Sequence, residues 1–186
     1  MPVLKRIVLQ FAGMLLLAGT VFFISAQAPS TREYQVKAVF LFNFTQFVEW
    51  PAAAFSSEQA PLVIGILGKD PFGSFLDETV SGEKINNHPI IIQRYSNIAE
   101  IKECHILFLN PESTSTLTEL LVKLQGKPVL TVSDNSSFIK AGGMIRFIVN
   151  RDSKIEIQIN PEPAKAEGLV ISSKLLRTSE IITPKK

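Results

Sequence analysis

Four short apolar runs, separated by segments with helix signals, are the feature that most constrains how this chain can fold. The runs cover residues 61–67, 89–95, 105–109 and 129–132. The segments with helical character lie between them, at residues 71–80, 98–103 and 113–124. Strands that alternate with helices predict a mostly parallel sheet with helices on both of its faces.

The pattern changes after residue 143. Two predicted strands at residues 144–149 and 154–159 are separated by only four residues, which is the spacing of an antiparallel hairpin. In the second of them polar and apolar residues alternate, so one of its faces is expected to meet solvent. We therefore predict a single-domain α/β sandwich in which about six strands form the central sheet and this hairpin lies at its edge.

An aromatic helix is predicted to precede the sheet, from Tyr34 to Trp50, where Pro51 stops it. Phe40, Phe44 and Phe47 form a second apolar stripe on this helix, in addition to the stripe that would face the core. We expect these three residues and Trp50 to form an interface with a partner or with a second copy of the chain. The alternative is that the chain's own sheet and C-terminal helix cover both stripes.

The first 28 residues have the layout of a secretory signal peptide. Lys5 and Arg6 precede an apolar run over residues 7–24, and Ala26-Gln27-Ala28 offers small residues for cleavage after Ala26 or Ala28. The chain thus divides into a signal peptide at residues 1–28 and a domain at residues 29–186. An uncleaved membrane anchor is the alternative, and either arrangement exports the domain, so we expect a periplasmic protein.

Charge and cysteine content narrow the functional classes. Residues 1–28 contain two of the 19 Lys and Arg residues and none of the 17 Asp and Glu residues, so residues 29–186 balance at 17 against 17. A balanced charge gives no electrostatic signal for nucleic acid or for an anionic lipid surface. Cys104 is the only cysteine and cannot form a disulfide within the chain.

No catalytic or metal-binding constellation is visible. Cys104 and His105 are adjacent at the start of a strand, so their side chains point to opposite faces and cannot form a nucleophile–base pair. His88 is the only other histidine, and the chain has no pair of metal ligands at motif spacing. We therefore predict no enzymatic activity, no metal and no cofactor.

The loops at the carboxyl ends of the parallel strands offer a second hypothesis, in which the protein binds a small ligand. Such loops meet at one edge of the sheet, where ligands commonly bind. Asp70 is expected to cap a helix that begins at Pro71. The candidate pocket residues are Gly68, Lys69, Asp70, Asn110, Ser133 and Asp134.

Several short motifs, in order along the chain, resemble those of the YfiR family of exported bacterial proteins. The similarity spans about residues 33–182 and is carried by segments 36–38, 42–44, 48–51, 64–68, 104–105, 129–134, 142–145, 159–160 and 168–176. Within these segments we assign a structural role to Lys37, Asn43, Gly142, Gly143 and Asn160.

The resemblance implies a periplasmic regulator that binds and inhibits the periplasmic domain of an inner-membrane signalling protein. That partner would be a diguanylate cyclase, so the regulator would lower cyclic-di-GMP and limit biofilm formation; a sensor kinase is the alternative partner. The resemblance also implies that the protein can form homodimers. Redox sensing through an internal disulfide, which some family members use, is not expected here because Cys104 has no partner.

Overall fold

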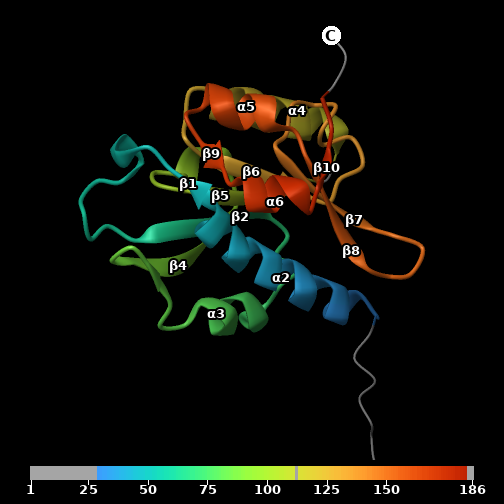
Figure 1. The fold of residues 1–186 in the computed structure, drawn as a ribbon, viewed down its shortest axis with the longest axis horizontal. Coiled ribbons are helices and arrows are strands. Elements are labelled where there is room, and N and C mark those ends of the chain that lie inside the picture. The colour runs from blue at the N-terminus through green and yellow to red at the C-terminus, as the bar shows by residue number, and fades with distance from the viewer. Residues whose placement is uncertain (1–28, 112, 184–186) are drawn as a thin grey trace, which may run out of the picture.

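The computed structural model describes residues 29–111 and 113–183, and the predicted signal peptide lies outside them. Eight strands form the main sheet in the order β10-β8-β7-β6-β5-β2-β4-β3, and β1 and β9 form a separate antiparallel pair (Figure 1). The strand bounds are β1 Val48–Glu49, β2 Leu62–Gly68, β3 Lys84–Ile85, β4 His88–Tyr95, β5 Ile106–Asn110, β6 Leu130–Ser133, β7 Ile145–Val149, β8 Ile155–Ile159, β9 Val170–Ile171 and β10 Glu180–Ile181.

The mostly parallel sheet predicted from the sequence is confirmed. Five neighbouring strand pairs are parallel, namely β2 with β4, β2 with β5, β5 with β6, β6 with β7, and β8 with β10. The predicted hairpin is the antiparallel pair β7–β8. It does not form the edge of the sheet, because β10 pairs with β8 on its outer side.

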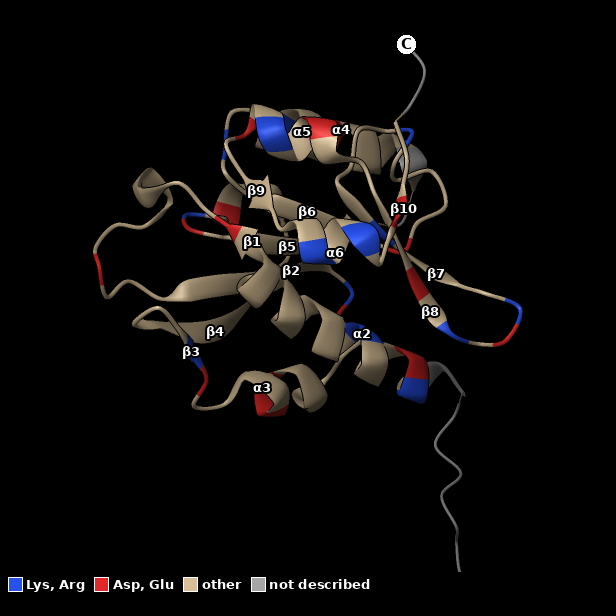
Figure 2. Cartoon of the chain, viewed as in Figure 1, with Lys and Arg blue, Asp and Glu red and all other residues tan. Residues whose placement is uncertain are grey.

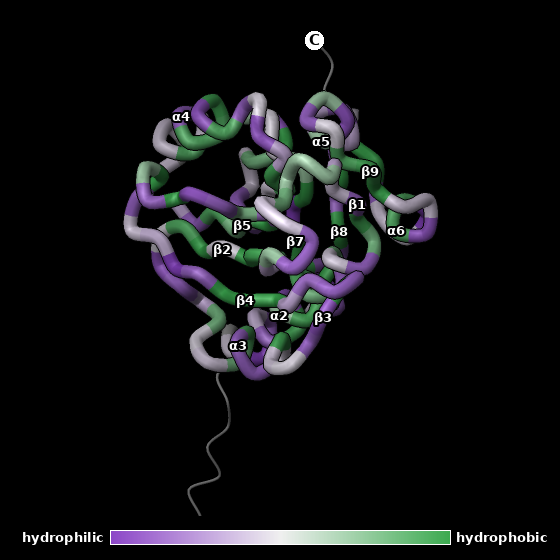
Figure 3. The backbone as a smooth tube through the Cα atoms, turned by 90° about the vertical axis from the view of Figure 1, so that its left-hand side faces the viewer, coloured by the Kyte–Doolittle hydropathy of each residue, from purple (hydrophilic) through white to green (hydrophobic). Residues whose placement is uncertain are grey.

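Helices cover both faces of the sheet, as predicted. The helix bounds are α2 Pro29–Phe47, α3 Ser74–Val80, α4 Thr114–Leu124, α5 Pro161–Ala166 and α6 Ser173–Arg177, with 3-10 turns at Ala52–Ala54 and Ile98–Glu100. Buried side chains of α2, α3 and α6 share one apolar cluster with one face of the strands. Those of α4 pack with Phe138 and Ile139 in a second cluster. Figure 3 shows the hydrophobic strands at the centre of the molecule.

Alternation along β5 explains why this strand holds the two layers together. Ile106 and Phe108 enter the first cluster, while Leu107 and Leu109 enter the second. All four side chains are completely buried. A strand covered on both faces is expected to be continuously apolar, as the parallel-sheet prediction required.

Three predicted helices differ in their bounds, and one of them, predicted at residues 98–103, is only the 3-10 turn Ile98–Glu100. α2 ends at Phe47 instead of Trp50, because Val48 and Glu49 pair with β9. α3 begins at Ser74, not at Pro71, and its N-cap is Gly73. Asp70 does not cap this helix, since its carboxylate accepts hydrogen bonds from the Phe72 amide and from Arg94.

The short strands β1, β3, β9 and β10 were not predicted. β3 and β4 form a hairpin joined by Asn86 and Asn87, which have positive φ angles of 49° and 68°. Asparagine tolerates this conformation better than most residues, and two such residues in succession are typical of a two-residue hairpin turn. The hairpin could therefore have been predicted from the two adjacent asparagines, Asn86 and Asn87.

Candidate functional site

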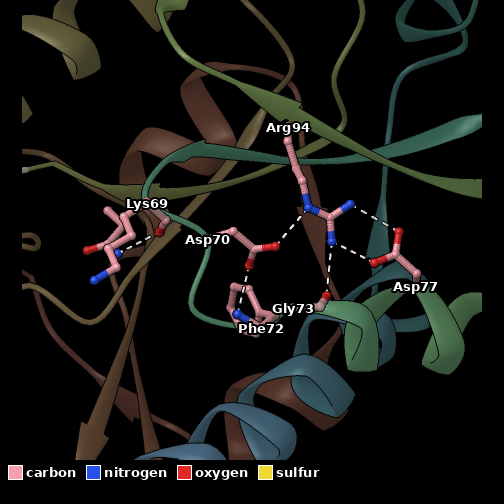
Figure 4. Close-up of polar contacts among 7 residues, drawn as sticks. Lys69, Asp70, Phe72, Gly73, Asp77 and Arg94 are labelled. Carbon is pink, nitrogen blue, oxygen red and sulfur yellow. Dashed lines mark hydrogen bonds and ion pairs between the residues drawn. The ribbon is translucent and has the colours of Figure 1, made fainter.

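The predicted pocket residues separate into three groups at the carboxyl edge of the sheet. Asp70 belongs to an ion-pair cluster with Arg94 and Asp77 (Figure 4). Arg94 Nε donates to Asp70 at 2.7 Å, while its two terminal nitrogens donate to Asp77 at 3.0 and 2.6 Å and one of them also donates to the Gly73 carbonyl. This cluster ties β4 to the start of α3, and both carboxylates are paired with the same guanidinium.

Ser133 and Asp134 turn away from Lys69, toward β5 and α2 respectively. Ser133 Oγ donates to the Leu109 carbonyl at 2.7 Å, inside the core. Asp134 accepts from Lys37 Nζ at 2.7 Å and from the Tyr34 hydroxyl at 2.9 Å. Both residues therefore hold the strand-edge loop against other elements.

Lys37 is the buried centre of a charge cluster whose two carboxylates are partly exposed. Lys37 is only 1% exposed, and its Nζ lies 2.5 Å from a carboxylate oxygen of Glu33 and 2.7 Å from one of Asp134. The ammonium also lies 4.3 Å from the centroid of the Tyr34 ring. Burial and the neighbouring Asp134 carboxylate raise the pKa of the Tyr34 hydroxyl well above its usual value, so this phenol stays protonated and donates.

Gly68, Lys69 and Asn110 line a cavity of about 420 Å³ beside the ends of β2 and β5. Asn110 Nδ2 donates to the Lys69 carbonyl at 2.8 Å. Gly68 has a φ of +96°, and a Cβ there would lie 2.5 Å from the Asn110 carbonyl oxygen. Only glycine fits this close approach of the two strand ends.

The aromatic residues of α2 contribute to a separate groove of about 490 Å³ between α2, β8 and α6. Phe40, Asn43 and Phe47 line it and are half-buried. Phe44 also lines it but is completely buried, because its ring stacks on Phe147 at 5.9 Å. Of the four predicted interface residues, the groove brings together these three phenylalanines and leaves out Trp50.

Trp50 instead fastens α2 and β1 to the sheet. Its indole Nε1 donates to the His105 carbonyl at 3.1 Å, and its ring meets the His105 ring edge-on. His105 Nδ1 accepts from the Val63 amide at 3.0 Å, so the proton lies on Nε2, which donates to the Ala54 carbonyl. His105 is thus a neutral, fully bonded core residue.

Phe55 completes this arrangement by lying between the two histidines. Its ring stacks on His88 at 4.0 Å and on His105 at 4.3 Å. Sequence reasoning considered the histidines only as catalytic bases or metal ligands and missed this stack. Its members come from three separate segments, so no local pattern could have revealed it.

The remaining motif residues have packing roles. A Cβ at Gly143 would collide with the Phe138 ring, while Gly142 has a φ of +101° and open space around it. Asn160 is 3% exposed, and its backbone N–H donates to the Met144 carbonyl at 2.8 Å. Cys104 is buried, and its thiol donates to the Ile106 carbonyl at 3.1 Å.

The described residues contain no group of three or more His, Cys, Asp or Glu side chains that could hold a metal ion. None of the helices within residues 29–183 is long and apolar enough to cross a membrane. Basic and acidic residues are interspersed along the described chain, in keeping with its balanced charge (Figure 2).

Comparison with known proteins confirms the resemblance seen in the sequence. The model of the YfiR/HmsC-like family, DUF4154, matches residues 34–180, which extend from the first turns of α2 to β10. No curated protein matches the sequence. At the level of the family, the match supports a periplasmic, non-catalytic regulator of cyclic-di-GMP signalling. The chain is a member of the YfiR/HmsC-like family.

Proposed function

We propose that this protein is exported to the periplasm and there binds and inhibits an inner-membrane diguanylate cyclase, using the groove between α2, β8 and α6 as its docking surface. The observation that carries the regulatory role is the match of the YfiR/HmsC-like family over residues 34–180. The choice of surface rests on the groove itself. A sensor kinase with a periplasmic domain is the second candidate partner.

The groove combines exposed apolar surface with a fixed shape. Phe40 and Phe47 present part of their rings to it, and Val36 and Val39 on the same helix are each 42% exposed. The Phe40 ring is held in place by two others, because it stacks on the Phe44 ring and its centroid lies 6.0 Å from that of Phe147. Aromatic side chains held in place by packing make effective interface anchors, because little conformational entropy is lost when the partner binds.

The charges in the groove indicate the chemistry of the partner. Glu156 and Glu180 line it, and the Lys174 ammonium lies 5.3 Å from the centroid of the Phe47 ring, so the two carboxylates outnumber this cation. Their carboxylates accept hydrogen bonds from Asn150 and Gln158, which hold them in place without neutralising them. The complementary partner surface is an apolar segment of the cyclase's periplasmic domain that carries a basic residue.

The test is a pair of measurements in cells, capture of the cyclase by the tagged regulator and the level of cyclic-di-GMP. Phe47→Ser and Phe40→Ser should weaken capture and raise cyclic-di-GMP, since each removes an apolar anchor. Glu156→Lys should do the same by charge repulsion. The matched control is Val122→Ser, because Val122 is 57% exposed on α4 and does not line this groove. Only variants whose melting temperatures match the parent are compared.

Two results would contradict different parts of the proposal. If the folded groove variants capture and repress normally, the regulatory face lies elsewhere on the domain. If deletion of the protein leaves cyclic-di-GMP unchanged and no cyclase is captured, the inhibitory role itself is wrong. Trp50→Ala is measured in the same series, because Trp50 was predicted to lie at the interface. Its indole N–H donates to the His105 carbonyl, so the variant's melting temperature has to be compared with that of the parent first.

A further inference from the structure

We propose that the cavity at the carboxyl ends of β2, β4 and β5 is a binding site for a small organic carboxylate with an apolar body. This site is separate from the groove on α2, and its occupation by a ligand does not depend on the regulatory role proposed above. The inference rests on the position of the cavity, on the residues that line it and on the charge that remains unpaired there.

The cavity lies where the order of the strands reverses. β2 is flanked by β4 on one side and by β5 on the other, and both neighbours run parallel to it. The connection after β2 contains α3, whose buried residues pack on one face of the sheet, while α4, after β5, packs on the other. Because the two connections leave toward opposite faces, a crevice opens above the strand ends, where open α/β sheets bind ligands.

The lining matches what a small ligand with an apolar body requires. Leu67, Ile98, Pro111 and Leu120 supply the apolar walls of the cavity, whose volume is about 420 Å³. Small-molecule sites typically have volumes of about 300–1,000 Å³, with apolar walls and a few polar groups that fix orientation. The strand ends that form the floor are held in place by the contact of Gly68 with Asn110.

The unpaired charge at the cavity is positive. Lys69 and Lys123 line it together with a single acidic residue, Glu119, and neither ammonium group makes an ion pair within the described part of the chain. Asp70, which follows Lys69 directly, forms an ion pair with Arg94. Figure 4 shows Lys69 and Arg94 on opposite sides of Asp70. The Arg94 ion pairs therefore leave Lys69 available to an anion.

Two lysines against one glutamate give the lining a net charge of +1, which suits a monoanion. Asn110 adds specificity, because its Nδ2 is used by the Lys69 carbonyl while its Oδ1 accepts no hydrogen bond within the described residues. That oxygen can accept a hydrogen bond from a hydroxyl or amide on the ligand. A carboxylate attached to a small apolar ring meets the charge and the apolar walls at once.

The test is an NMR titration of the purified exported protein, without any cyclase, with three probes: sodium benzoate, neutral benzamide and inorganic phosphate. Benzoate should shift the amide signals of Gly68, Lys69, Ile98 and Leu120 and saturate. Benzamide, which has the same ring without the charge, should bind about tenfold more weakly, as should phosphate, which lacks the apolar body.

Charge-neutral variants identify the site. Lys69→Gln combined with Lys123→Gln should weaken benzoate about tenfold. The matched control combines Lys140→Gln with Lys165→Gln, since both of these lysines are exposed and neither lines the cavity. The proposal is overturned if benzoate shifts no signals around the cavity, if benzamide binds equally well, or if the double Lys69 and Lys123 variant binds benzoate unchanged.

Discussion

The indole nitrogen of Trp50 donates a hydrogen bond to the backbone carbonyl of His105, 3.1 Å away. The same carbonyl also accepts from the Leu130 amide, so one oxygen joins the end of β1 to β5 and β6. Trp50 therefore connects the segment after α2 to the centre of the sheet. Trp50 was predicted to be an interface anchor, but it has this structural role, so an experiment on Trp50 has to measure stability and binding separately.

Trp50→Phe should lower the free energy of unfolding by about 1 kcal/mol, because the substitution removes a hydrogen bond and leaves the His105 carbonyl with only one donor. Urea denaturation measures this difference. Capture of the partner by the folded variant should be unchanged. Loss of capture without loss of stability would instead assign Trp50 to the interface.

Lys37→Met should destabilise the domain by about 3 kcal/mol, because it leaves Asp134 and Glu33 without their shared cation. A double-mutant cycle with Asp134→Leu checks the cause, since the second substitution should cost less when Lys37 is already absent. Lys84→Met is the matched control, because Lys84 is exposed and makes no ion pair within the described residues. Equal losses for Lys37 and Lys84 would show that the buried pair contributes nothing.

Cys104 should be inert toward a thiol reagent at about pH 8 in the folded protein and react rapidly after unfolding. Burial raises the pKa of its thiol to about 12, so the reactive thiolate is scarce in the native state. Cys104→Ala should cost only about 1 kcal/mol and leave regulation intact. Rapid labelling of the native protein, or loss of regulation in the folded variant, would contradict the structural role of this residue.

The parallel sheet was predictable because its central strands β2, β5 and β6 are mostly apolar runs, each separated from the next along the chain. The sequence of β2, for example, is continuously apolar from Leu62 to Leu67, and these residues are all buried. The two-residue strands had no such signal. Glu180 and Ile181 become a strand only because β8 offers them an unpaired edge, so their conformation depends on the tertiary structure.

The candidate sites were predictable only in part, for a related reason. Strand order places Gly68 beside Asn110, and that proximity followed from the parallel topology. The direction in which the Asp134 side chain points could not be predicted from the topology. Asp134 could have faced the strand-edge cavity, but Lys37 on α2 is close enough to draw its carboxylate away. The sequence separation of 97 residues carries no information about this pair.

His105 should make the stability of the domain depend on pH in the weakly acidic range. Burial lowers the pKa of its imidazole from the usual value of about 6.5, and protonation of Nδ1 would also break the hydrogen bond that this nitrogen accepts from the Val63 amide. The unfolded chain therefore binds a proton more readily than the native state does. The contribution of neutral His105 to stability is complete above about pH 6.5 and is lost progressively as the pH falls toward the lower, native pKa.

The measurement is urea denaturation of the parent, His105→Gln and His88→Gln between about pH 7.5 and pH 5. His105→Gln should lower stability at neutral pH, because glutamine cannot reproduce both ring hydrogen bonds and the stack on Phe55. It should also flatten the decline toward acid, since the group that must be protonated is absent. His88→Gln keeps His105 and should keep that decline. An equally steep decline in His105→Gln would place the acid sensitivity in the carboxylates instead.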